Sequence, residues 1–200
     1  MGNCISKATL AGAALVALAG CFNEPEPAYK TRPEGAEVRL NDLGLEKLET
    51  KLDAEVVVYI NLDRNNLTVL PPEVLSCRKL KWLRLNSNRL SVLPDMAELR
   101  DLRRIYLKNN RFMEVPPALE KLDKLTDIDL SGNPIREIPD WLAKKRGLKN
   151  LSFTRTLVRK LPDDLSAWRD LDSLQLGDLE LSAGEMARIR RALPKVAIVF

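Results

Sequence analysis

The stretch Leu80–Pro94, which reads LKWLRLNSNRLSVLP, contains a pattern that recurs along most of the chain. Written out, the pattern is L-x-x-L-x-L-x-x-N-x-L-x-x-L-P, in which x is any residue. Four further stretches fit the same frame: Val57–Pro71, Leu102–Pro116, Leu125–Pro139 and Leu148–Pro162. A fixed period of this length predicts a solenoid in which each repeat is one structural unit.

The pattern also predicts a short strand in each unit. Leu83 and Leu85 alternate with Trp82, Arg84 and Asn86, so the two leucines face one side of the strand. One unit cannot bury its own apolar side, so we expect neighbouring strands to stack about 4.8 Å apart in a parallel sheet over a continuous core. The expected core pairs are Ile60/Leu62, Leu83/Leu85, Ile105/Leu107, Ile128/Leu130, Leu151/Phe153 and Leu174/Leu176.

The asparagine of the pattern has a structural role in this interpretation. The slot holds Asn65, Asn88, Asn110 and Asn133 at steps of 23, 22 and 23 residues, and Thr156 occupies it 23 residues later. Each stands where the chain must turn inward after its strand. A side-chain amide can satisfy the backbone groups that such a turn leaves unpaired, and those groups are costly when buried without a partner.

This spacing resembles that of the leucine-rich repeat family, in the variety with Leu-Pro after the asparagine segment and units of about 23 residues. The resemblance covers roughly residues 36 to 200. It implies an α/β repeat solenoid: a horseshoe with a parallel β-sheet on the concave side, helical or irregular segments on the convex side and a cap at each end. Such a fold hosts many functions, so function has to be sought on its surface.

The composition excludes several kinds of chemistry. The 200 residues contain no histidine, which removes Ser-His and Cys-His nucleophile pairs and imidazole metal sites. There is no glycine-rich phosphate loop, and Asp127 and Asp129 are expected to be solvated on an open sheet, without the burial that would split their pKa values. We therefore expect no enzyme: no catalytic residue, no metal, no cofactor and no small-molecule substrate. Cys77 is expected to be a small buried residue, not a reactive thiol.

Residues 1–20 resemble a bacterial lipoprotein signal peptide. Lys7 precedes an apolar run from Ala8 to Ala19, and about 12 apolar residues are too few to span a bilayer. The ending Leu18-Ala19-Gly20-Cys21 resembles the site at which the Cys21 thiol is acylated before cleavage. The resemblance implies a lipid-anchored protein of the bacterial cell envelope, with Cys21 as the first residue of the mature chain.

Residues 21–36 are expected to carry the lipid on Cys21 and to form a flexible tether. Phe22–Ala36 reads FNEPEPAYKTRPEGA, which is rich in Pro and Glu and offers little to bury. If extended at about 3.1 Å per residue, it would reach roughly 45 Å from the membrane. Phe22 is not the Asp associated with inner-membrane retention, which favours the outer membrane.

A second interpretation of the N-terminus stays open. Met1–Ser6 reads MGNCIS, which also fits the pattern for N-myristoylation of Gly2 with a second acyl chain on Cys4. It would place the chain on a eukaryotic membrane, but it leaves the apolar run and the Leu-Ala-Gly-Cys ending unexplained. Both interpretations predict contact with a membrane through an N-terminal lipid.

Residues 37–200 are expected to form the repeat domain with its two caps. In Val38–Ala54, Leu45, Leu48 and Leu52 fall at helical spacing, and Val38 and Leu40 alternate like an edge strand. At the other end, Ser182–Glu185 has a capping-box pattern that predicts a helix with Met186, Ile189 and Leu193 on its apolar face, ended by Pro194. Val196–Phe200 is predicted to form a closing strand, with an edge for a partner as the alternative use.

The strand residues that face away from the core are the candidates for binding. Aromatic residues and arginines gather in the early half, and these are the residue types that dominate protein–protein hot spots. The predicted binding residues for a protein or peptide are Tyr59, Trp82, Arg84, Arg104, Tyr106, Lys108, Asp127 and Asp129. In the alternative, Arg84 and Arg104 pair with Asp127 and Asp129 and stack on the rings, which gives a self-satisfied surface.

A basic run supplies a second candidate surface. Between Trp141 and Pro162 no acid interrupts the cations Lys144, Lys145, Arg146, Lys149, Arg155, Arg159 and Lys160. Their field would attract anionic lipid, glycan or nucleic acid. The alternative function is therefore an envelope-associated structural protein that contacts anionic lipid or glycan. We expect the cations to be spread over several faces as a solvated basic surface, and we expect no nucleic-acid partner.

Overall fold

The computed structural model describes residues 35–49 and 51–200. The predicted signal peptide (residues 1–20), the lipidation site Cys21, residues 22–34 of the predicted tether and the alternative acylation site Gly2 lie outside the described residues. The assignments made for them stay predictions.

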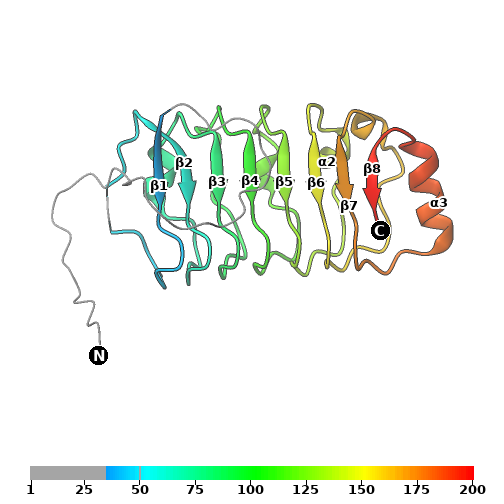
Figure 1. Cartoon of the computed structure of the whole chain (residues 1–200), viewed down its shortest axis with the longest axis horizontal. Coiled ribbons are helices and arrows are strands. Elements are labelled where there is room, and N and C mark those ends of the chain that lie inside the picture. The colour runs from blue at the N-terminus through cyan, green and yellow to red at the C-terminus, as the bar shows by residue number, and fades with distance from the viewer. Residues whose placement is uncertain (1–34, 50) are drawn as a thin grey trace.

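Eight strands form one parallel sheet in which they lie side by side in sequence order, β1 to β8 (Figure 1). One strand comes from each successive unit, and short helices connect several of them. The elements are β1 Ala36–Arg39, β2 Val57–Asn61, α1 Pro72–Ser76, β3 Trp82–Arg84, β4 Arg104–Tyr106, η1 Pro117–Leu119, β5 Asp127–Asp129, α2 Asp140–Lys144, β6 Asn150–Ser152, η2 Ser166–Trp168, β7 Ser173–Gln175, α3 Ala183–Ala192 and β8 Ala197–Val199.

The register of the sheet places equivalent positions of the repeat next to one another. Leu83 of β3 aligns with Ile105 of β4, which aligns with Ile128 of β5. All twelve residues of the predicted core pairs are buried. With the strands on one side and the short helices on the other, the predicted α/β leucine-rich-repeat solenoid is confirmed.

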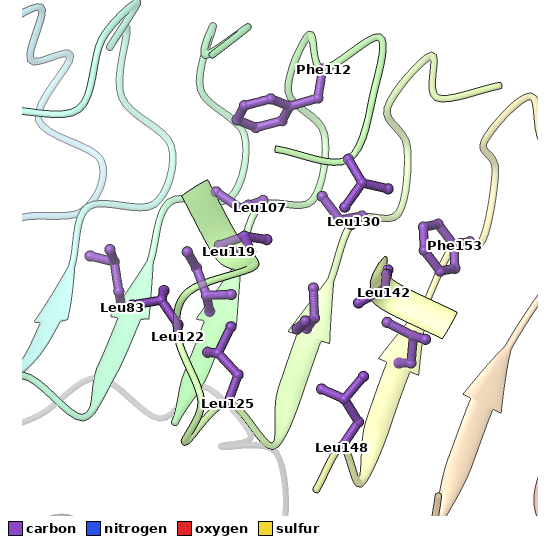
Figure 2. Close-up of a cluster of buried hydrophobic side chains, with 14 of the residues drawn as sticks. Leu83, Leu107, Phe112, Leu119, Leu122, Leu125, Leu130, Leu142, Leu148 and Phe153 are labelled. Carbon is purple, nitrogen blue, oxygen red and sulfur yellow. The ribbon is translucent and has the colours of Figure 1, made fainter. Parts of the chain in front are cut away.

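The core lies between the sheet and the connecting segments. In Figure 2, Leu107 and Leu130 extend from the strand side of their units, and Leu119, Leu122 and Leu125 come from the segment that returns between β4 and β5. Each of these side chains is less than 2% exposed, so neighbouring units share one continuous core instead of forming separate ones.

The asparagines at the turn bond to the backbone of their own unit and of the unit before. The Nδ2 of Asn110 donates to the carbonyl of Leu85 at 2.9 Å and to that of Leu107 at 2.9 Å, and its Oδ1 accepts from the Leu90 N–H at 3.1 Å. Asn65, Asn88 and Asn133 make the same set of bonds in their units. The amides therefore tie successive units together along one edge of the core.

One slot on the convex side breaks the apolar pattern. Three residues before the leucine that opens each frame, the slot holds Cys77, Leu99, Leu122, Lys145 and Trp168 in successive units. The other four side chains are buried in the core, Cys77 among them as a free thiol, whereas Lys145 is only half-buried. Trp168, in the next unit, is fully buried, and its indole N–H donates to the Leu142 carbonyl at 2.9 Å.

The first cap differs from the expectation of a helix. Between β1 and β2 the described residues 40–49 and 51–56 form turns and irregular backbone. Gly44, at a φ of +65°, excludes a right-handed helical turn at residue 44, and Asn65 Oδ1 accepts hydrogen bonds from the Leu43 and Leu45 N–H groups. The segment thus packs as a truncated repeat, with Leu48 buried against the first full unit.

The second cap is the helix α3 followed by the strand β8. The Ser182 Oγ accepts from the Glu185 N–H at 3.1 Å, which is the first half of a capping box. The second half is not formed, because the Glu185 carboxylate instead accepts from the Leu161 N–H at 2.8 Å and pairs with Arg188. Ile189 and Leu193 are buried, so α3 closes the open end of the core.

Candidate functional site

Four of the predicted binding residues lie together on the outward face of β3 and β4. Trp82 aligns with Arg104, and Arg84 aligns with Tyr106. All four are half-buried, and we call them the concave cluster. The parallel register brings together residues that lie 22 positions apart in sequence.

The concave cluster alternates rings and guanidinium groups both along and across the strands. The Arg104 Cζ lies 4.4 Å from the Trp82 ring centroid, and the Arg84 Cζ lies 5.8 Å from the Tyr106 centroid. Tyr59 of β2 meets Trp82 edge to face, with ring centroids 5.9 Å apart. Each contact of this kind is worth roughly 0.5–1.5 kcal/mol, so together they hold the rings in place.

Buried carboxylates fix the two arginines. The Asp63 Oδ2 accepts from Arg84 Nη2 at 2.6 Å and Nε at 2.7 Å, while Arg104 Nε lies 3.4 Å from Asp127 Oδ2. The alternative pairing with Asp127 and Asp129 is therefore right for Arg104 and wrong for Arg84, whose partner is Asp63. Burial raises the pKa of Asp63 and outweighs the opposing effects of Arg84 and of the bonds from Asn86.

Two of the predicted binding residues are too buried to form the contact surface. Tyr59 is 6% exposed and Asp127 is 4% exposed, and burial raises the pKa of Tyr59. The expectation that Asp127 is solvated is wrong, because its carboxylate accepts from Asn150 Nδ2 at 2.7 Å and from Thr126 Oγ1 at 2.5 Å. Both residues support the concave cluster from below and beside it.

Lys108 and Asp129 lie at the margin of the concave cluster and are half-buried. The Asp129 carboxylate accepts from the Ser131 N–H at 2.9 Å. Farther along the sheet, Asn150, Ser152 and Gln175 give a face of small polar groups. The Ser131 and Ser152 hydroxyls lie 2.6 Å apart in this region.

The basic run does not form an acid-free surface. Its members Lys144, Lys145 and Arg146 line a depression of about 600 Å³ with Trp141, but Glu120 and Asp123 line it too. The Lys145 ammonium donates to the Glu120 carbonyl at 2.8 Å, and burial lowers its pKa. Three later cations pair with acids: Arg155 with Asp178, Arg159 with Glu180 and Lys160 with Asp163.

Within residues 35–49 and 51–200, no group of three or more Cys, Asp or Glu side chains is placed to hold a metal ion. In the same part of the chain, no helix has the length and apolar character needed to cross a bilayer. Burial raises the pKa of the Cys77 thiol, so it is a core residue with little thiolate character.

A stack of short parallel strands with an asparagine ladder defines a leucine-rich-repeat solenoid. The family model described as leucine rich repeat matches residues 56–112 and 78–135 of this chain. The two matches together span residues 56–135, and the parallel strands continue the same stack on both sides of this range. Such repeats are typical of noncatalytic protein-interaction modules, and this is the class of function that the fold indicates.

Solved structures show the same fold. A leucine-rich-repeat protein of Leptospira interrogans is 24% identical with a TM-score of 0.62, over 72% of this chain and 43% of that one. An internalin of Listeria monocytogenes is 17% identical with a TM-score of 0.55, over 72% of this chain and 50% of that one. This chain thus matches half or less of the length of either protein. A comparison with curated protein sequences found no match.

Proposed function

We propose that this protein is a noncatalytic leucine-rich-repeat module that binds a protein or peptide on its concave face. We further propose that lipid on Cys21 anchors it at the bacterial cell envelope, with the outer membrane favoured. The observation that carries the binding proposal is the position of Trp82 and Tyr106, half-buried on the outward face of the sheet. Phe112, Phe153 and Trp168, by contrast, are fully buried in the core.

The rings are held in position before any partner arrives. Arg84 and Arg104 lie over Tyr106 and Trp82, and the buried Asp63 and Asp127 hold the two guanidinium groups. Ordering a long side chain at an interface costs about 0.5–1.5 kcal/mol, and a preordered cluster avoids much of that cost. An aromatic and arginine surface of this kind is the usual composition of an interface hot spot.

The polar half of the sheet complements this anchor. Hydroxyl and amide groups on β6 and β7, such as those of Ser152 and Gln175, can bond the backbone of an extended segment. A peptide or a protein surface is long enough to reach from β3 to β7, since adjacent strands lie about 4.8 Å apart. The open face therefore suits a macromolecular partner.

Replacing Trp82 and Tyr106 together with alanine is expected to weaken partner binding about 30-fold or more, because hot-spot truncations cost about 2 kcal/mol or more. We would crosslink the lipidated protein in its membrane, isolate the complexes and identify captured proteins by mass spectrometry. The affinity for the captured protein would then be measured with purified components. The double variant also loses the three ring contacts of the cluster, so its free energy of unfolding is expected to fall by about 2–4 kcal/mol, and thermal unfolding would verify that it is still folded at the assay temperature.

Trp141→Ala is the matched control for this experiment, because Trp141 is also half-buried among cations but lies on the convex side. Its capture should equal that of the parent protein. Capture that survives Trp82→Ala/Tyr106→Ala but is lost with Lys144→Glu/Arg146→Glu would instead place the site on the basic surface and favour the envelope-structural function. Equal capture by every variant would reject both surfaces.

The anchor has its own test. Cys21→Ser is expected to abolish incorporation of labelled palmitate and to release the protein from the membrane fraction, because the thiol is the acyl acceptor. Gly2→Ala is the paired control, since it removes only the acceptor for N-myristoylation. Unchanged labelling in Cys21→Ser with loss in Gly2→Ala would overturn the lipoprotein assignment.

A further inference from the structure

The charges around the concave cluster divide into paired and unpaired groups. On the sheet face, Arg84 and Arg104 are neutralised by the buried carboxylates Asp63 and Asp127. On β1, Arg39 pairs with Glu37 at 2.9 Å. These ion pairs hold their side chains in place but add little to the net electrostatic field. The charge of the attracted partner is therefore decided by the charged groups without an ion-pair partner.

Five cations on the two units that carry the concave cluster have no carboxylate within 4.0 Å among the residues that the structure describes. We call them the cation frame, and its members are Lys81, Arg89, Arg103, Lys108 and Arg111. The three arginines are exposed, and the two lysines are half-buried. The salt bridges of the described chain involve other residues.

The backbone fixes the cation frame at both ends of β3 and β4. Lys81 and Arg103 stand immediately before the two strands, and the Arg103 N–H donates to the Lys81 carbonyl at 2.8 Å. Arg89 and Arg111 directly follow the asparagines at the far turn of the same two units. Lys108, between these ends, donates its N–H to Asn86 Oδ1 at 2.9 Å.

Few anions offset this charge. Asp129 is the one carboxylate on this part of the sheet face without a cation within 4.0 Å in the described chain. Asp101 lies near the strand-start end, where it is bonded to Lys124 at 2.5 Å. The bond from Lys124 is the largest cause that lowers the pKa of Asp101, and the charges of Arg103 and Lys81 lower it further.

We propose that the partner presents an acidic protein segment to the concave face, with its carboxylates toward the cation frame and an apolar or aromatic side chain against the edge of Trp82. This inference rests on the proposed function of the same site. It adds the chemistry of the ligand: a peptide segment rich in Asp and Glu that carries at least one large apolar residue.

The arrangement of the rings favours peptide over single-stranded nucleic acid. Bases bind such surfaces by stacking on open aromatic faces. Here Arg104 lies over Trp82 and Arg84 lies over Tyr106, so a guanidinium already covers one face of each ring. The ring edges remain for side-chain packing, while the cation frame meets carboxylates at the two rims.

The test uses the full-length protein in detergent and a phage-displayed library of random 12-residue peptides. Selected peptides are expected to be enriched in Asp and Glu over the starting library and to contain an aromatic or large aliphatic residue. The strongest binder is then synthesised beside a version in which every Asp and Glu becomes Asn or Gln. The neutral version should bind about tenfold or more weakly, and the acidic one should lose affinity with added salt.

Two charge-reversal variants show where the acidic peptide binds. Arg89→Glu/Arg111→Glu alters the cation frame without touching the concave cluster and should weaken binding at least about tenfold. Arg191→Glu/Lys195→Glu changes the total charge equally at the second cap, where both side chains are exposed, and should leave binding unchanged. Equal loss in the two variants would show a nonspecific charge effect and overturn the inference.

The outcomes separate this inference from the binding proposal. Peptides that need Trp82 and Tyr106 but show no acidic enrichment would overturn the acidic-ligand inference and leave the concave site in place. Peptides indifferent to Trp82→Ala/Tyr106→Ala, or no selected peptides at all, would overturn both. Tighter binding of a 12-nucleotide oligothymidine than of the acidic peptide would replace the acidic peptide with a nucleic acid.

Discussion

Replacing Trp168 with alanine is expected to lower the free energy of unfolding by about 3–5 kcal/mol, because truncating a buried Trp removes its transfer free energy and leaves a cavity. Trp168 is 0% exposed and lies in η2, and its indole N–H donates to the carbonyl of Leu142 in α2. The side chain fills core space next to a unit in which Lys145 stands at the equivalent slot. Urea unfolding followed by circular dichroism would measure the loss.

Trp168→Phe separates volume from hydrogen bonding in this prediction. Phenylalanine keeps much of the apolar volume but has no N–H, so the expected loss is smaller, about 1–2 kcal/mol. The Leu142 carbonyl would still accept from the Lys145 N–H at 3.1 Å. A Trp168→Ala variant no less stable than Trp168→Phe would show that the indole is not a packing element of the core.

The second large effect is expected for Asn110→Ala, which should lower the free energy of unfolding by about 3 kcal/mol. The substitution leaves the buried Leu90 N–H without its acceptor, and an orphaned buried donor costs about 1–3 kcal/mol. It also removes one of two asparagine bonds to each of the Leu85 and Leu107 carbonyls, which Asn88 and Asn133 continue to supply. Chemical denaturation of the purified variant is the measurement.

Asn66→Ala provides the comparison for the ladder asparagine. Asn66 is half-exposed and makes one side-chain bond, from Nδ2 to the Gly44 carbonyl at 3.3 Å. Its replacement is expected to change the free energy of unfolding by less than about 0.5 kcal/mol. Similar losses of unfolding free energy for Asn66→Ala and Asn110→Ala would show that the asparagines of the repeat pattern have no special stabilising role.

Most of the fold could be predicted from the sequence because the same pattern of apolar residues recurs in five units, with the asparagine in four of them. The alternation of Leu83 and Leu85 with Trp82 and Arg84 gives the strand, and the period places the strands in register. The first cap could not be predicted in the same way. Leu45, Leu48 and Leu52 fit helical spacing, but Asn65 Oδ1 binds the backbone of this segment across the turn, and tertiary contacts outweigh local spacing.

The positions of the concave cluster could be predicted from the sequence, but the burial of the side chains around it could not. The two-residue alternation predicts that Tyr59 and Asp127 face away from the core. It does not predict that Trp82 packs against Tyr59 or that Arg104 packs against Asp127, and these contacts bury both residues. Asp63 was missed as the partner of Arg84, although the sequence shows that it continues the alternating, outward-facing positions Tyr59 and Asn61. Two-residue periodicity assigns a face; burial on that face depends on the side chains of three adjacent units.

Lys145 affects how cooperatively the repeat units of the solenoid unfold. In a linear stack each unit contacts only its neighbours, so cooperativity is limited by the poorest interface. A half-buried lysine in a slot that is apolar elsewhere makes the α2 unit such an interface. We therefore expect unfolding to divide at this unit even though the core runs through it, with β3 and β4 on its N-terminal side. Unfolding that starts at α3 would stop at the α2 unit, so the concave cluster on β3 and β4 would remain folded after the second cap has unfolded.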